Sequence, residues 1–282
     1  MREVDVIGMT MQGWPVAGRV IAAVLLAAAV SAAAPAAARA QGSSPNSGRI
    51  SFTGNLDATN AYLFRGIPQD DTKVILWPSI DAGVALSSRL KLNVGLWNSL
   101  DTGATGLDGP SGKLWYESDF YGSLTYTVGG LSMGAMYTGY TSPNNAFATV
   151  QEIAVKVAHS GRMKPYVLTA FELKGQADGG QGLGRYLEVG GAPSWGTALT
   201  LAVPVKVGLS LGDYYELLSS QGDERFGFFS VAGTLTRTMS SGAYGSWNVH
   251  GGVEYLLLGD RNALVLGSDS KVVGSVGIGF SY

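Results

Sequence analysis

The chain has 282 residues, of which 14% are charged and 10% are aromatic, with 41 glycines, no cysteine and a formal net charge of −2. The lack of cysteine excludes disulfides, thiol chemistry and cysteine-ligated metals. The near-neutral charge, without a basic run or patch, argues against a nucleic-acid partner. Soluble domains carry roughly 25% charged residues, so the low charge is a first indication against an ordinary soluble domain.

The first forty residues predict a secretory signal peptide. Arg19 is followed by an apolar stretch over 20–30 and by small residues up to Ala38-Arg39-Ala40. This is the order of a basic region, a hydrophobic core and an A-x-A cleavage site. The alternative is a membrane anchor, but its core is short for the about 20 residues of a spanning helix. We expect cleavage after Ala40, a short polar leader over 41–48, and Met9 or Met11 as alternative initiators.

From residue 49 onward, segments of about ten residues alternate in hydrophobicity, which predicts strands. In 199–211, leucine or valine takes every second position, and polar or small residues take the positions between. Because successive side chains of a strand point to opposite faces, each segment has one apolar and one polar face. Twelve such segments are predicted, at 50–65, 74–87, 90–99, 115–128, 131–141, 149–159, 165–174, 185–193, 199–211, 226–238, 246–258 and 272–282.

The connections alternate in length, which distinguishes a membrane barrel from a soluble sandwich. Long links such as 66–73, 100–114 and 213–225 alternate with short ones such as 87–89 and 129–130. Outer-membrane barrels have short periplasmic turns and long outer loops. A sandwich would alternate in hydrophobicity as well, but the link lengths, the low charge and the final strand favour the barrel. We therefore predict an all-β fold over 49–282: one antiparallel up-and-down transmembrane β-barrel of about 12 strands, exported through the periplasm of a Gram-negative bacterium and surrounded by outer-membrane lipid.

Charged residues within the predicted strands share the parity of the polar face, so we expect them to line the lumen. Eight are acidic and five are basic, counting Lys174, which indicates a polar interior of paired charges with a mild cation preference. Twelve strands lie between a filled and a water-holding barrel, so the predicted function is passive diffusion of small solutes through a narrow lumen. The predicted lumen-lining charges are Asp57, Arg65, Asp81, Lys91, Glu117, Asp119, Glu152, Lys156, Glu172, Glu188, Lys206 and Glu254.

Aromatic residues near the segment ends are expected to form girdles at the membrane interfaces. Trp77 and Trp97 instead share the inward parity and are candidates for the lumen. The residues expected in the girdles are Tyr62, Phe64, Tyr116, Tyr126, Trp247, Tyr255 and Tyr282.

A lipid hydrolase centred on His250 is one alternative function, and a non-conducting structural or adhesive barrel is another. Ser230, Ser275 or Ser281 would be the nucleophile and Glu254 the orienting acid, but no spacing motif selects any of them. The acidic loops 68–71 and 221–225 are candidate calcium sites, but we expect their charges to be solvated. We predict no catalytic residue, no metal and no cofactor.

The last strand, "SVGIGFSY", resembles the C-terminal sorting signal of outer-membrane barrels at Ser275, Gly277, Phe280 and Tyr282. The resemblance implies recognition by the barrel-assembly machinery. The strand's parity directs Ile278, Phe280 and Tyr282 to lipid, and we expect it to close the barrel by pairing with the first strand, which leaves no free edge.

The segment 54–86, with Tyr62, Phe64, Arg65, Gly66 and Ile67 followed by a polar loop, resembles the opening hairpin of the TorF-type porins of bacterial outer membranes. Segments 92–100 and 115–128 resemble the next strands of that family, and Pro68 departs from its pattern. The resemblance implies an outer-membrane pore. Separately, the inward parity of Arg65 suggests that it pairs with Asp81 or Glu117 and anchors the first loop at the mouth.

Overall fold

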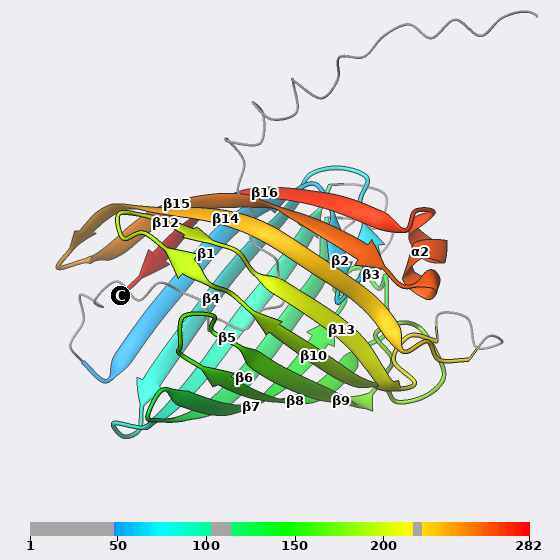
Figure 1. The fold of residues 1–282 in the computed structure, drawn as a ribbon, viewed down its shortest axis with the longest axis horizontal. Helices are drawn as coiled ribbons and strands as arrows, with labels where there is room; N and C mark the ends of the chain where they lie inside the picture. Colours follow the sequence, from blue (N-terminus) through cyan, green and yellow to red (C-terminus); the bar gives the residue numbers. More distant parts are fainter. Residues whose placement is uncertain (1–47, 103–113, 217–221) are drawn as a thin grey trace, which may run out of the picture.

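The computed structural model describes residues 48–102, 114–216 and 222–282. The expected signal peptide, nearly all of the leader and parts of the 100–114 and 213–225 connections lie outside the described residues. The described chain forms a closed antiparallel barrel of twelve strands, as predicted, and the strands cross the barrel obliquely (Figure 1).

The barrel strands agree with the predicted segments to within a few residues at most ends. The short strands β12 and β13 follow each other in the chain and together form one of the twelve strands of the wall. In chain order the wall contains β1 (Ile50–Thr59), β4 (Ile75–Ala85), β5 (Leu90–Asp101), β6 (Trp115–Val128), β7 (Leu131–Thr141), β8 (Val150–His159), β9 (Tyr166–Lys174), β10 (Arg185–Gly191), β12 (Leu199–Ala202), β13 (Val205–Gly212), β14 (Phe226–Gly242), β15 (Gly245–Leu258) and β16 (Ser270–Ser281).

The last strand closes the barrel on the first, which confirms the predicted pairing. Thr53 lies opposite Ser281 and Thr59 lies opposite Ser275 in an antiparallel register. On its other edge β16 pairs with β15. Closure satisfies the backbone hydrogen bonds of both edges, as a barrel wall in a membrane requires.

The outer surface of the wall is apolar. In β16, the outward residues Val276 and Ile278 are 61% and 46% exposed, whereas the inward residue Ser275, which precedes Val276, is 5% exposed. The same alternation places Phe120, Leu124 and their counterparts in the other strands on the exterior. The described part of the chain holds no helix with the length and apolar character needed to cross a membrane.

Three departures from the predicted pattern involve short elements. Pro204 has no N–H to donate and divides the ninth strand into β12 and β13, both of which pair with β14. The two-residue strand β11 (Ser194–Trp195) pairs with β12. A short helix, α2 (Asp260–Leu266), occupies a connection predicted to be a plain loop, and the carboxylate of Glu224 accepts the N–H groups of Asp260 and Arg261 at its start.

The largest departure is at the first segment, which was predicted as one strand over 50–65. The barrel strand β1 ends at Thr59, and β2 (Tyr62–Phe64) and β3 (Ile67–Asp70) form a separate two-stranded sheet. Figure 1 places β2, β3 and α2 at the same end of the barrel, and α2 contacts β3. We call this end, where the longer connections join the strands, the loop end, and the opposite end the turn end.

Candidate functional site

The β2–β3 hairpin folds into the barrel at the loop end. Tyr62, Phe64, Ile67 and Asp70 are each at least 94% buried. The two turn residues between the strands, Arg65 and Gly66, both have positive φ, at 51° and 84°, which is the backbone of a tight type I′ hairpin. The first loop is thus folded into the barrel, where the sequence predicted that the first strand continues to residue 65.

Arg65 fixes this hairpin to the barrel wall. Its Nη1 lies 2.6 Å from Oε2 of Glu152 on β8 and its Nη2 lies 2.7 Å from Oε1, a two-pronged ion pair. Nη1 also donates to the Tyr214 hydroxyl at 2.7 Å, and the guanidinium lies 4.3 Å from the centre of the Tyr186 ring. Burial raises the pKa of Tyr214 well above its usual value, so this phenol stays neutral.

A second contact holds the backbone of the turn. The Tyr215 hydroxyl donates to the carbonyl oxygen of Arg65 at 2.9 Å. Arg65 therefore anchors the first loop, but the two partners expected for it, Asp81 and Glu117, were wrong. The strand ended earlier than its alternation indicated, and the turn brought the side chain to β8.

Aromatic side chains fill the space around the hairpin. The Tyr62 ring lies 5.5 Å from both Trp77 and Trp97, and Phe64 lies 5.3 Å from Tyr140. The inward prediction for the two tryptophans is confirmed. The girdle prediction is wrong for Tyr62 and Phe64, because the chain leaves the wall after Thr59.

Tyr116 also lies inside, 4% exposed, against the girdle prediction. The register between β5 and β6 shifts between Ser99 and Leu100, so that β6 has one extra residue and Tyr116 turns inward beside Glu117. The outward positions of the remaining girdle candidates agree with the prediction. These are Tyr126, Trp247, Tyr255 and Tyr282, between 37% and 48% exposed.

Most of the other predicted lumen charges have partners across neighbouring strands. Lys206 lies 3.5 Å from Glu254, and Glu188 accepts hydrogen bonds of 2.7 Å from Tyr166 and Tyr186. The Lys156 ammonium lies 4.0 Å from the centre of the Tyr166 ring. These contacts make a group of partnered charges and phenols on the inner wall.

Three more predicted charges lie apart from this group. Asn93 donates to Asp81 at 2.6 Å. Lys91 is exposed near the short turn that precedes β5. Glu172, at the loop end of β9, accepts the N–H groups of Ala177 and Gly184 at 2.6 and 2.7 Å.

Glu117 and Asp119 differ from the rest, because no basic residue of the described chain forms an ion pair with them. Both are over 90% buried. They lie two residues apart on the inner face of β6 and hydrogen-bond to each other, which requires that one of the two carboxyls carries a proton. Glu117 also hydrogen-bonds to Tyr62. Oδ1 of Asp119 has no hydrogen-bond partner. The negative charge that remains on this buried pair is costly unless another group compensates it.

The geometry around His250 does not support a serine hydrolase. Nε2 lies 2.6 Å from Oδ1 of Asp57, and Nδ1 lies 2.8 Å from Oδ1 of Asn248. A general base needs a nitrogen within reach of a serine hydroxyl. Both ring nitrogens are occupied, and no hydrogen bond joins a serine to His250 among the residues described.

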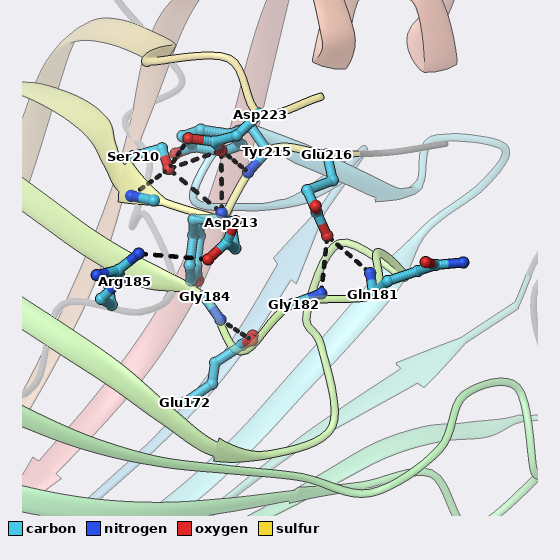
Figure 2. Close-up of polar contacts among 12 residues, drawn as sticks. Glu172, Gln181, Gly182, Gly184, Arg185, Ser210, Asp213, Tyr215, Glu216 and Asp223 are labelled. Atoms are coloured by element: carbon cyan, nitrogen blue, oxygen red, sulfur yellow. Dashed lines mark hydrogen bonds and ion pairs between the residues drawn. The ribbon is translucent and has the colours of Figure 1, made fainter. Parts of the chain in front are cut away.

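The outer loops are organised by carboxylates that accept backbone N–H groups (Figure 2). Glu216 accepts from Gln181 and Gly182, which joins the connection after β13 to the one after β9. Asp223 accepts from the hydroxyl of Ser210 and the backbone of Tyr215. The expectation of solvated charge is wrong for Glu224, which is half-buried and accepts N–H groups at the start of α2, whereas Asp223 is exposed to solvent as well as hydrogen-bonded. The contacts of Glu216 and Glu224 join residues far apart in sequence, so no local pattern indicates them.

No protein-family model matches the sequence, and no curated protein matches it either. Among solved structures, the chain is similar to the NanC porin, with a TM-score of 0.44 and 9% identity over 82% of this chain and 98% of that chain. It is similar to the KdgM porin solved with disordered oligogalacturonate (TM-score 0.42, 8% identity, 82% and 99% covered). A third similar structure is outer membrane phospholipase A from Escherichia coli (TM-score 0.41, 8% identity, 81% and 92% covered).

Because these TM-scores lie below 0.5, the class of the protein rests on its own barrel. A closed antiparallel barrel with an apolar exterior and charges inside is a transmembrane β-barrel of the outer-membrane type. The likeness to the TorF-type porins stays a resemblance, since no family model supports it.

Proposed function

We propose that this protein is an outer-membrane channel for passive diffusion of small solutes, and that the β2–β3 hairpin sets the width of its pathway. The observation that carries the proposal is the hairpin itself, buried within the loop end of a barrel whose inner wall bears charged and phenolic side chains. An interior of this composition suits water and polar solutes better than a packed apolar core does.

The way in which the hairpin is attached supports a role in controlling passage. β2 and β3 pair only with each other, and the wall strands pair among themselves without them. Side-chain contacts through Arg65, Tyr214 and Tyr215 hold the hairpin in place. The hairpin can therefore shift while every backbone hydrogen bond of the wall stays intact, as expected for a loop that gates a site.

The test is single-channel recording in planar bilayers with the wild-type protein and a variant in which residues 61–71 are replaced by a short glycine–serine linker. We expect small conductance steps from the wild type and clearly larger steps from the variant, because the linker removes the constriction. Folding of both is checked by the heat-dependent mobility shift of barrels on gels. Two well-folded barrels without steps above background would refute the channel and favour the non-conducting structural barrel.

A further inference from the structure

A cavity of about 50 Å³ lies between the hairpin and the inner wall. Four aromatic rings and one carboxylate dominate its lining, with the amide of Gln69 at one side. The rings are those of Tyr62, Phe64, Tyr140 and Phe147, and the carboxylate is that of Glu117. Phe147 and Tyr116 form an edge-to-face pair at 5.4 Å, which fixes the ring from the 142–149 connection against the wall.

The charge around this cavity lacks an internal counterpart. Glu117 hydrogen-bonds to Tyr62 and to Asp119 behind it, and one oxygen of Asp119 has no partner. Because one proton is shared in the Glu117–Asp119 contact, the pair carries one negative charge. Asp101 lies near enough to repel Glu117. Arg65 forms its ion pair with Glu152, and no basic residue of the described chain forms an ion pair with Glu117 or Asp119. A cation is therefore the ligand that would best compensate the negative charge of this pocket.

The lining distinguishes between kinds of cation. A metal ion needs several oxygen ligands at short distance, and no group of three or more acidic or histidine side chains in the described chain is arranged to hold one. Aromatic faces instead attract ammonium groups and tolerate the carbon attached to them. The pocket therefore combines a carboxylate, which can accept a hydrogen bond from an ammonium group, with aromatic rings that can contact the carbon attached to that group.

The volume limits the size of the ammonium group. A cavity of about 150 Å³ accepts benzene, with six heavy atoms, so about 50 Å³ accommodates roughly two. A nitrogen and its attached methylene fit within this volume. We infer that this pocket binds the ammonium head of a primary aliphatic amine, with Glu117 as the charge partner and the four rings as its walls.

If the bound amine is also a solute that passes through the barrel, the inference rests on the proposed channel function, because the pocket adjoins the hairpin proposed to set the width of the pathway. Binding itself is independent of conduction. It is measured by calorimetric titration of the purified full barrel in detergent micelles with n-propylammonium, and with 1-propanol as the neutral molecule of the same shape. Binding without conductance would refute the channel function and support the amine-binding pocket. Conductance without binding would support the channel function and refute the pocket.

The decisive variants are Glu117→Gln and Glu188→Gln. The first removes the charge partner from the pocket. The matched control removes an equally inward carboxylate that already has two phenol donors. We expect Glu117→Gln to weaken propylammonium binding by about tenfold or more, the scale of a lost charge-assisted hydrogen bond, and Glu188→Gln to leave it unchanged.

A third variant keeps the test open if Glu117→Gln does not fold. Phe147→Leu removes one ring in a loop outside the barrel strands, and we expect about threefold weaker binding, in line with one cation–π contact. Equal affinity for propanol and propylammonium would overturn the inference. So would unchanged propylammonium affinity in both the Glu117 and the Phe147 variants.

Discussion

Replacing Arg65 with methionine should both destabilise the protein and open its pathway. Methionine keeps much of the length and apolar stem of arginine but loses the charge and all donors. The substitution leaves Glu152, which is 2% exposed, as a buried carboxylate without its ion-pair partner. It also removes the donor to the Tyr214 hydroxyl.

The geometry of the ion pair sets the size of the effect. The Arg65 and Glu152 side chains are 8% and 2% exposed, so water screens the pair very little. Breaking a buried ion pair by removing one partner costs about 3–5 kcal/mol. A surface pair supplies the contrast: Arg185 and Asp213 lie 3.3 Å apart with side chains 53% and 43% exposed, and such pairs contribute about 0–1 kcal/mol.

The assay is urea unfolding of the barrel in lipid vesicles, followed by tryptophan fluorescence, together with conductance in planar bilayers. Arg65→Met should lose about 3–5 kcal/mol of unfolding free energy and show larger conductance steps, whereas Arg185→Met should match the wild type in both. Replacing Glu152 with leucine in the Arg65→Met background should recover much of the loss, because no buried charge then remains. An Arg65→Met protein as stable and as weakly conducting as the wild type would refute the role assigned to this ion pair.

Two further outcomes test other parts of the fold. Gly66→Ala should destabilise the hairpin by about 1–3 kcal/mol. Gly66 has a φ of 84°, and an added Cβ would lie 2.9 Å from Cβ of Phe228. Unfolding measurements that find Gly66→Ala as stable as the wild type would contradict the I′ turn. Removal of residues 278–282 should abolish assembly into the outer membrane, because it deletes four of the seven closing pairs with β1 and both aromatic residues, Phe280 and Tyr282, of the proposed assembly signal. Normal heat-modifiable barrel in the membrane fraction would count against both roles.

The wall of the barrel could be predicted from the sequence, because lipid imposes one rule on every strand. Each outward position must be apolar, so parity alone predicted that Ile278 faces out and Glu254 faces in. That rule does not apply inside the barrel. Tyr62 and Phe64 continue the alternation of β1, and only the turn at Arg65-Gly66, whose pair of positive φ angles is not evident from these residue types, takes them out of the wall.

The candidate pocket was predictable only in part. The inward parity of Glu117 was correct, but the sequence could not show that it lacks a basic partner, since that depends on where Arg65 lies. Phe147 and Gln69 come from connections, whose positions follow from packing rather than from any local pattern.

The carboxylates that order the outer loops have a consequence for how that surface responds to its surroundings. Glu216 and Asp223 bind backbone N–H groups of the chain itself, so these contacts need no bridging divalent cation. The outer face should therefore keep its shape when a chelator strips calcium and magnesium from the surrounding lipopolysaccharide.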